Sequence, residues 1–386
     1  MKKRWYKIVP AALCIMLAMS ACGKDNDNTK FTGDVTEELP YQGNLNAIAP
    51  SAYNNVKGLD LEPGTFISVI GKDNDSSYWS EVKRGVMQAA ADLNAELGYT
   101  GDDKVKVTYN APSGSEDIDE QVNILDEELA RYPDAVVIAS IGSESCHVQF
   151  DLATENGIPI VAMDSANSHQ AVQCTVATNN VEAGATCGHK MIDELEGTGK
   201  VLIVAHDSDS GSAVDREGSF RSVLEEEQTV TAADTIYLNK LEETKAAIAE
   251  AENANRAEGE AEVQADTITD EDVIVYYLEN DPEIKGVYAT NLYTTRLAVK
   301  GIEKAGKTEE TVLIGFDGGK EQIEDLKAGK IKGLVVQNPF GMGYASVVAA
   351  ARTALHSGNE AMIDTGYVWV TEDNLEEPSI KPLLYK

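Results

Sequence analysis

The sequence predicts an α/β protein made of two doubly wound lobes, each built on a parallel sheet. From Thr65 onward, short apolar segments rich in β-branched residues alternate with segments of helical periodicity. The same alternation begins again after TVAT (175–178). The chain from about residue 60 onward is also too long for a single comfortable hydrophobic core, because single cores stop growing at about 250–300 residues.

The first series of elements begins with an apolar strand and an amphipathic helix. In that helix Val82, Val86 and Leu93 recur at helical spacing, and a continuous apolar run such as AVVIAS is typical of a buried strand. The expected strands are TFISVI (65–70), KVKVTYN (104–110), AVVIAS (135–140) and PIVAMDS (159–165). The expected helices cover 78–97, 117–131 and 145–155.

The second series repeats the pattern with one interruption. Its expected strands are TVAT (175–178), KVLIVAH (200–206), TIYL (235–238), GVYATN (286–291), TVLIGFDG (311–318) and IKGLVVQ (331–337). Its expected helices cover 181–195, 212–226, 292–305 and 319–328. The pattern alone does not assign the last helix, 339–357, or the strand IDTGYVWV (363–370) to either lobe.

Residues 241–270 interrupt the second series. They are rich in Ala and Glu and have few large apolar residues, so helix propensity is high while little can be buried. We expect an extended surface helix followed by a loop. The alternative is a helix that binds a partner.

The N-terminus has the order of an export signal. MKKRWYK (1–7) is basic, and the apolar run 8–22 is shorter than the about 20 residues that span a bilayer. Met19-Ser20-Ala21-Cys22 is similar to a bacterial lipobox, which implies a signal peptide over 1–21 and a lipid anchor at Cys22, on the extracytoplasmic face of the cell membrane. An ordinary secretory signal with an incidental cysteine is the alternative. Residues 22–64 are polar and aperiodic, as in a flexible tether.

Charge and cysteine content exclude several function classes. The net charge is −33, and removal of 1–21 takes away four basic residues and no acidic ones, which argues against nucleic acid and against electrostatic binding to anionic lipid. Cys146, Cys174 and Cys187 permit either one disulfide and a free thiol or three buried thiols. No Cys or His spacing suggests a metal site, and we expect no metal and no cofactor.

Polar side chains follow almost every expected strand. The carboxyl ends of parallel strands meet at one edge of a sheet, where open α/β proteins bind ligands. Carboxylates and amides bond to hydroxyls, and aromatic faces cover the C–H faces of sugar rings. The strand ends therefore predict a site for a small polar ligand such as a sugar. They carry KDNDSSYW (72–79), Asp164-Ser165, DSDSGSAVDR (207–216), Asn291, Asp317-Gly318-Gly319 and Gln337-Asn338.

From about residue 65 to residue 370 the chain resembles the periplasmic sugar-binding proteins of the ribose/galactose type, the type I receptors of ABC importers. Seven segments in the same order carry the resemblance: 67–85, 157–166, 179–184, 208–220, GVYATN (286–291), IGFDGG (314–319) and VVQNPFGMGY (335–344). The lactose-repressor family shares this fold but begins with a DNA-binding helix-turn-helix, where this chain has its signal. The resemblance implies two Rossmann-like lobes joined by a three-strand hinge near 178, 337 and 366.

The hinge positions imply the domain boundaries. The N-terminal lobe would comprise 65–178 and 338–366, and the C-terminal lobe 179–337 and 367–386. The protein would be a monomeric, non-enzymatic receptor that captures a sugar or sugar-like polyol between its lobes and delivers it to an ABC permease. A sensor that signals to a membrane histidine kinase or chemoreceptor is the alternative. A glycosidase that uses Asp164 and Asp317 as its carboxylate pair is a third hypothesis.

The family's ligand residues carry over to individual positions. Tyr78 and Trp79 would stack on the ligand, although consecutive helical residues lie about 100° apart, so we expect at least one to face the cleft. Ser76 stands where the ribose-type proteins often have Asn. The acid of the first lobe is Asp164. On the second lobe and the hinge the matching residues are Asn291, Asp317 and Gln337.

Two arginines of the ribose-type pattern are absent. Ser165 and Val214 occupy their positions, and Arg216 matches a later arginine. Charged hydrogen bonds contribute about 1.5–3 kcal/mol each, so the departures weigh against ribose and favour a larger or differently substituted sugar, or another polyol. Lys72 is a candidate replacement charge.

Each candidate also has a purely structural interpretation. Asp164 and Asp317 can cap the following segments, and Ser76 can cap the first helix. Asn291 can be a turn residue, and Gln337 can serve only as a hinge hydrogen bond. The run Asp73-Asn74-Asp75 lacks the spacing of a calcium loop and is expected to be a polar turn.

Overall fold

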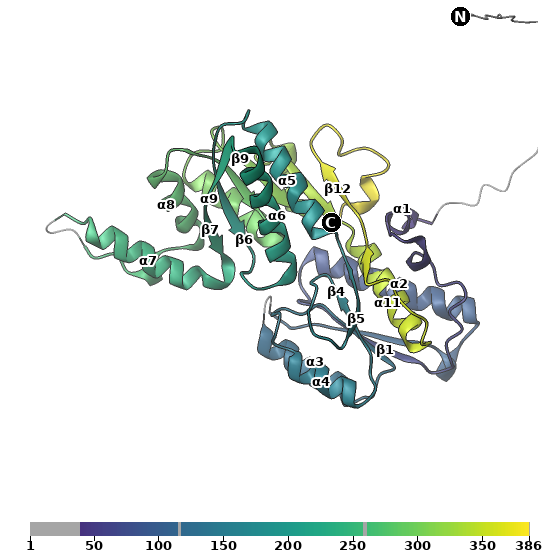
Figure 1. The fold of residues 1–386 in the computed structure, drawn as a ribbon. Coiled ribbons are helices and arrows are strands. Elements are labelled where there is room, and N and C mark those ends of the chain that lie inside the picture. The colour runs from purple at the N-terminus through teal and green to yellow at the C-terminus, as the bar shows by residue number, and fades with distance from the viewer. Residues whose placement is uncertain (1–38, 115–116, 258–260, 386) are drawn as a thin grey trace, which may run out of the picture. The chain divides into compact units, whose positions relative to one another are not determined.

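The computed structural model describes residues 39–114, 117–257 and 261–385 (Figure 1). The predicted signal peptide, Cys22 and the first part of the predicted tether lie outside these ranges. Residues 40–386 form one compact unit that contains two six-stranded sheets. Among the described residues, no helix is both long and apolar enough to cross a membrane.

The first sheet has the strand order β11-β5-β4-β3-β1-β2, and all its pairs are parallel. Its strands are β1 (Phe66–Ile70), β2 (Lys106–Asn110), β3 (Ala135–Ile138), β4 (Ile160–Met163), β5 (Val172–Ala177) and β11 (Met362–Asp364). Successive residues of a strand point to opposite faces. Val137 therefore packs with the side chains of α2 (Ser77–Leu97) and α11 (Pro339–Ala354), while Val136 packs with those of α3 (Ile118–Leu129) and α4 (His147–Glu155).

The second sheet has the order β12-β10-β9-β8-β6-β7, and only β12 is antiparallel to its neighbour. Its strands are β6 (Gly199–Ala205), β7 (Val230–Tyr237), β8 (Ile284–Ala289), β9 (Val312–Phe316), β10 (Gly333–Gln337) and β12 (Tyr367–Val370). Its helices are α5 (Asn180–Glu194), α6 (Gly211–Glu227), α7 (Leu241–Ala254), α8 (Asp270–Asn280), α9 (Leu292–Lys304) and α10 (Lys320–Lys327). The predicted α/β fold with two parallel-sheet lobes is confirmed.

The chain passes between the two sheets three times. It leaves the first sheet after β5, returns after β10 through α11, and leaves again between β11 and β12. The segment IDTGYVWV, which the pattern did not assign, is thus divided between the lobes. Asp364 fixes this crossing, because its Oδ1 accepts hydrogen bonds from the backbone N–H groups of Asn179 (3.3 Å) and Gly366 (2.8 Å).

The flexible tether predicted over 22–64 is wrong from residue 40 onward. This stretch contains α1 (Gln42–Asn46) and buries apolar side chains, so packing rather than composition decides its state. Asn44 lies at the hinge, where it exchanges hydrogen bonds with Asn338, and Tyr53 accepts one from the backbone N–H of Glu360 (2.8 Å). The buried apolar residues are Leu45, Ile48, Tyr53, Val56, Leu59 and Leu61.

Helices α2 and α11 approach each other closely because a glycine on each faces the backbone of the other. A Cβ on Gly343 would lie 2.0 Å from the carbonyl oxygen of Val82, and a Cβ on Gly85 would lie 2.0 Å from that of Phe340. Neither backbone can move aside without separating the helices. Only glycine fits at these two positions.

We expect Gly343→Ala to lower the free energy of unfolding by about 1–3 kcal/mol, the usual cost of overpacking a tight contact. Urea unfolding measures this change. Gly218→Ala is the matched control, since Gly218 lies within α6 and a Cβ there meets no atom within 4 Å. Alanine is the better helix former, so the control should be neutral or slightly stabilising. Equal stability of the Gly343 variant and the wild type would contradict the packing argument.

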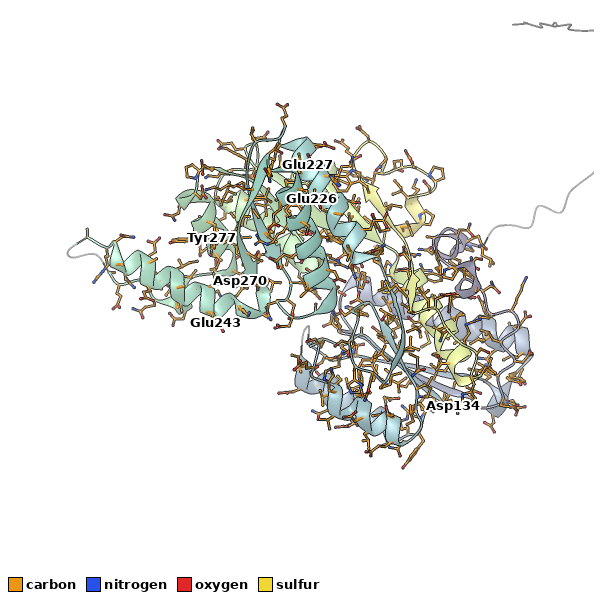
Figure 2. The ribbon with its side chains drawn as sticks, in the orientation of Figure 1. Asp134, Glu226, Glu227, Glu243, Asp270 and Tyr277 are labelled. Carbon is orange, nitrogen blue, oxygen red and sulfur yellow. The ribbon has the colours of Figure 1, made fainter. Side chains whose placement is uncertain are left out.

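Residues 241–270 were predicted to form a surface helix followed by a loop. The helix of this segment, α7, projects from the second lobe (Figure 1). Ile248 and Ala249 are its only buried residues. Lys245 ties its first turns to the start of α8 through an ion pair with Asp270 (2.8 Å), and Asp270 and Glu243 lie where α7 joins the lobe (Figure 2).

Candidate functional site

A cavity lies at the carboxyl ends of strands from both sheets, where the ligand site was predicted. In the closed arrangement of the structure its volume is about 40 Å³, so it has room for water but not for a sugar ring. Among the described residues it is lined by Lys72, Asp73, Ser76, Tyr78, Trp79, Asp164, His206, Ser212, Arg216, Asn291, Leu292, Tyr293, Asp317 and Gln337. Every predicted ligand residue except Ser165 is in this lining.

The two aspartates occupy equivalent places in the two lobes. Asp164 follows β4 and Asp317 follows β9, and both have a left-handed backbone, with φ of 62° and 76°. Non-glycine residues adopt this region rarely, although Asp tolerates it better than most. Neither residue caps the next helix, since Asn179 caps α5 and Gly319 precedes α10. Their backbone strain is of the kind that clusters at functional sites.

Asp164 is the centre of a buried polar group in the first lobe. Tyr78 donates a hydrogen bond to its Oδ1 (2.7 Å), and the ammonium of Lys72 lies 3.4 Å from its Oδ2. Lys72 also donates to the hydroxyl of Ser165 (2.7 Å), which is buried and is not among the lining residues. Burial, followed by the charge of Asp164, raises the pKa of Tyr78 well above its ordinary value, so this hydroxyl remains a donor.

Tyr78 and Trp79 both face the cavity. Their rings meet edge to face, with centroids 5.3 Å apart and an angle of 84°. Ser76 caps α2 by accepting a hydrogen bond from the backbone N–H of Trp79 (3.2 Å), so it serves both as a cap and as part of the lining. The cap fixes where the helix starts and hence the direction of both rings. The turn before it is held by Asp73, whose Oδ1 accepts from the backbone N–H groups of Asp75 and Ser76.

The second lobe supplies a chain of bonds that runs into the hinge. Gln337 donates to Asp317 Oδ1 (2.9 Å) and accepts from Thr178 (3.0 Å) and from Arg216 (2.7 Å). Because residues 178 and 337 are hinge positions, Gln337 joins the site to two of the three crossings. Both interpretations of Gln337 are therefore compatible with its place in the structure. Asn291 likewise caps α9 through the backbone N–H of Thr294 (2.9 Å) and also lines the cavity.

Arg216 is the main residue of the site that the sequence reasoning left out. It is 2% exposed and donates to Asn180 Oδ1 (2.9 Å), to the carbonyl oxygen of Thr290 (2.7 Å) and to Gln337. Val214, at the position of the missing arginine, is 49% exposed and lies outside the lining. The absence of a guanidinium at position 214 agrees with the sequence comparison, and Arg216, two residues further along α6, supplies the guanidinium of this segment.

The other lining residues that were missed are Asp73, His206, Ser212, Leu292 and Tyr293. Asp73 and Ser212 lie in two of the segments that carry the family resemblance, and His206 is the last residue of a predicted strand. The sequence could therefore have placed these three residues at the site. The pKa of His206 is held well below its ordinary value by burial and by the nearby charges of Arg216 and Lys72, so the ring is neutral. Tyr293 follows a helix cap and had no signal of its own.

Hydrogen bonds join the lobes across the cavity. The hydroxyls of Ser165 and Ser212 lie 3.2 Å apart, and Tyr293 donates to Asp73 Oδ2 (3.1 Å). A ligand larger than a few waters therefore enters only if these contacts separate and the lobes move apart.

Burial raises the pKa of Asp317, an effect that Arg216 opposes. The folded state then binds more protons than the unfolded state between the unfolded pKa and the raised folded pKa. Stability falls as pH rises through that window and remains lower above it.

We expect Asp317→Asn to remove this loss of stability, since its amide oxygen can still accept from Gln337. The variant's stability relative to wild type should increase from about pH 3 to about pH 8 in urea unfolding. A pH-independent difference would contradict the assignment.

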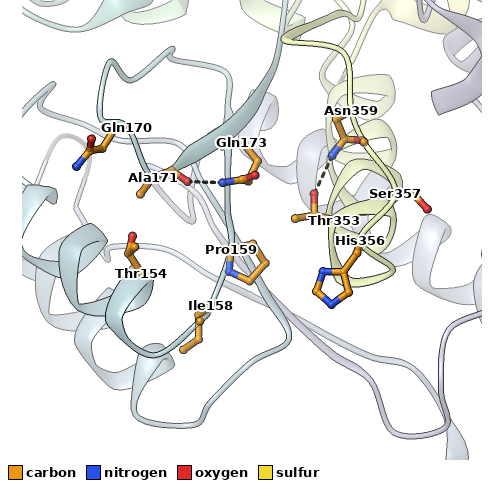
Figure 3. A pocket seen from close by; sticks show the side chains of 12 residues that line it. Thr154, Ile158, Pro159, Gln170, Ala171, Gln173, Thr353, His356, Ser357 and Asn359 are labelled. Carbon is orange, nitrogen blue, oxygen red and sulfur yellow. Dashed lines mark hydrogen bonds between the residues drawn. The ribbon is translucent and has the colours of Figure 1, made fainter.

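A larger cavity of about 600 Å³ lies elsewhere on the first lobe (Figure 3). Pro159 and Ala171, which line it, precede β4 and β5, so it opens at the amino ends of these strands. Ligands of open α/β sheets bind at the opposite ends. Its lining also lacks an Asp, Glu, Lys or Arg side chain. We therefore do not assign it as the ligand site.

The described cysteines are buried and isolated from one another in bonding terms. The structure leaves Cys146, Cys174 and Cys187 as buried free thiols, with pKa values raised by burial. Within the described ranges no cluster of three or more His, Cys, Asp or Glu side chains is arranged to hold a metal ion.

Known proteins that are similar in sequence to this chain include proteins named for binding a polyol or a sugar. The xylitol-binding protein of Mycolicibacterium smegmatis is 25% identical over 305 residues, covering 78% of this chain and 76% of that protein. The D-allose-binding periplasmic protein of Escherichia coli is 24% identical over 299 residues, covering 74% and 85%.

Solved structures that are similar to this chain include solute-binding proteins with bound sugars. An ABC transporter solute-binding protein from Agrobacterium vitis with bound D-fucose is 26% identical with a TM-score of 0.68, covering 83% of this chain and 100% of that one. A carbohydrate transporter solute-binding protein from Agrobacterium radiobacter, in complex with D-arabinose, is 25% identical with a TM-score of 0.68, covering 83% and 98%. Residues 67–358 match the family described as periplasmic binding protein domain, and because this match covers most of its length, the chain belongs to that family.

Proposed function

We propose that this protein captures a sugar or sugar-like polyol between its two lobes and delivers it to an ABC permease. The observation that carries the proposal is the buried set of acids, amides and aromatic rings at the carboxyl ends of both sheets. Asp164, Asn291 and Asp317 offer groups that bond to hydroxyls, and Trp79 offers a flat apolar face. Relatives named for xylitol, ribose, apiose and allose support this ligand class.

The charges of the site favour a neutral ligand. Both cations of the lining are already engaged: Lys72 with Asp164 and Ser165, and Arg216 with Gln337 and other acceptors. An anionic ligand would therefore meet the negative charge of Asp164 without an uncommitted cation nearby. Hydroxyl groups, in contrast, can both donate to carboxylates and accept from amides.

Binding would couple to closure of the lobes. A ligand that bonds to Asp164 on the first lobe and to Asn291 or Asp317 on the second interacts more strongly with the closed arrangement than with an open one. Such a difference in affinity shifts the population toward the closed form, which would then be presented to the permease. Relatives that are named import binding proteins favour transport over the signalling alternative.

A ligand panel tests the proposal. We expect at least one neutral sugar or polyol to raise the melting temperature, because ligand binding to the native state stabilises it by RT ln(1 + [L]/Kd), about 2.7 kcal/mol at a hundredfold excess over Kd. The panel includes D-ribose, D-allose, xylitol, D-galactose and D-glucose, with amino acids and a dipeptide as controls. If only an amino acid or peptide stabilises the protein, the proposed ligand class is wrong.

We also infer that the protein is held on the extracytoplasmic face of the membrane by lipid at Cys22. The basic residues, apolar run and Ala21-Cys22 of the N-terminus support this. Radiolabelled palmitate should be incorporated into the wild-type protein and not into Cys22→Ser, and the variant should leave the membrane fraction. Equal labelling of the two proteins, or none of either, would contradict lipidation at this cysteine.

A further inference from the structure

A second cavity, of about 520 Å³, adjoins the site on the second lobe. His206, Asn291 and Tyr293 line both cavities, so the two spaces share a wall. The volume is within the ~300–1,000 Å³ typical of small-molecule sites, in contrast to the small space between the closed lobes.

The order of strands places this cavity as a continuation of the site. In the second sheet β8 is followed by β6 and then by the edge strand β7. The site uses residues at the carboxyl ends of β8 and β6. The second cavity adds Leu238 and Asn239, which follow β7. It therefore extends the site along the same sheet edge, toward the outside of the lobe.

The segment 241–270 contributes no residue to the lining of the site, but it contributes to the wall of the second cavity. Leu241 begins α7 and Asp270 begins α8, and both line the cavity. The ion pair of Lys245 with Asp270 joins these two elements at the point where α7 leaves the lobe (Figure 2). The two ends of this segment, where it joins the lobe, thus form part of the wall of a space beside the ligand site.

The chemistry of the lining suits a neutral ring. Leu238, Leu241 and Leu297 are half-buried and give an apolar floor, and the ring of Tyr293 stands at the boundary with the site. Asn239 adds an amide, held by hydrogen bonds with Ser208.

The charges of this lining balance in pairs. Asp270 is engaged by Lys245 (2.8 Å), and Arg296 by Glu321 (2.5 Å). The remaining charged residues, Glu271 and Lys300, have opposite signs. A phosphate or a carboxylate would find no excess of positive charge in this lining.

We propose that this cavity binds a second sugar ring, linked to the one in the site, so that the ligand is a disaccharide or a longer glycoside. The inference rests on the proposed function, because the first ring must occupy the site. The linkage between the rings would lie against His206, Asn291 and Tyr293, which line both cavities. The apolar floor and Tyr293 would cover the C–H face of the second ring, and Asn239 would bond to its hydroxyls.

The test compares monosaccharides with their own disaccharides by isothermal titration calorimetry: D-glucose with cellobiose and maltose, D-galactose with lactose and melibiose, and D-xylose with xylobiose. We expect at least one disaccharide to bind about tenfold or more tightly than its monosaccharide. If a monosaccharide binds and no disaccharide binds more tightly, the second cavity is not a subsite and the proposed function stands. If no sugar binds at all, the proposed function itself fails.

Variants that fill the second cavity provide a second test of the proposal. Lys300→Trp and Asn239→Trp place bulk into it from two different elements, both at exposed positions, so loss of folding in one leaves the other informative. Each should weaken disaccharide binding about tenfold and leave monosaccharide binding within about twofold. Val148→Trp, at a 76% exposed position on α4, is the matched control and should change neither. Unchanged disaccharide affinity in both filled variants would overturn the proposal.

Discussion

Asp164→Ala is expected to weaken sugar binding by about 1.5–3 kcal/mol or more, since a buried carboxylate that bonds to a ligand hydroxyl makes a charge-assisted hydrogen bond. It should also lower the free energy of unfolding by about 3–5 kcal/mol, because it leaves the ammonium of Lys72 buried without its partner. Lys72 is 5% exposed. Calorimetry with the best sugar of the panel measures the first effect, and urea unfolding the second.

A double variant separates these two effects. Lys72→Met with Asp164→Leu removes both charges, and replacement of a buried ion pair by apolar side chains is often neutral for stability. We expect it to recover most of the lost stability and none of the lost affinity. Full affinity in a stable double variant would remove Asp164 from the ligand site.

Arg216→Ala is expected to have the second large effect, on the hinge as well as on the site. It leaves acceptors on two buried residues, Asn180 and Thr290, without the donor that Arg216 supplies, each at a cost of about 1–3 kcal/mol, and Gln337 keeps only its bond from Thr178. The guanidinium also packs over the ring of Phe316, 4.3 Å from its centroid. We therefore expect the free energy of unfolding to fall by about 3 kcal/mol or more in urea unfolding.

The variant should also affect the titration of Asp317. Arg216 opposes the rise in the pKa of that carboxyl, so its removal should raise the pKa further. Arg221→Ala on the same helix is the matched control. Its ion pair with Glu217 is partly exposed and contributes about 1 kcal/mol or less. Equal stability losses in the two arginine variants would show that the buried network of Arg216 is not what holds the hinge.

Much of the architecture followed from the pattern of the sequence. The strands β3 (AVVI) and β9 (VLIGF) are apolar throughout because both faces of a parallel sheet are covered, and this makes them recognisable. The polar residues at strand ends could be found because sheet geometry gathers them at one edge. Asp164, Asn291 and Asp317 accordingly lie around one cavity.

The remaining features depend on tertiary contacts that no local pattern encodes. The segment 40–64 is polar on average, and its few apolar residues are buried only because a hinge and two helices are there to receive them. Arg216 lies in a helix whose sequence looks solvated, and its burial depends on the close approach of α5, where Gly184 meets the Arg216 backbone. Tyr293 bonds to Asp73 of the other lobe, a contact between residues far apart in the sequence.

A crystal structure of the protein with the best sugar of the panel tests the central claim most directly. We predict one sugar ring between the lobes, with its hydroxyls within hydrogen-bond distance of Asp164 on the first lobe and of Asn291 or Asp317 on the second, and with its C–H face against Trp79. A sugar bound elsewhere, for example in the cavity lined by Pro159 and Ala171 (Figure 3), with the space between the lobes holding only water, would contradict it.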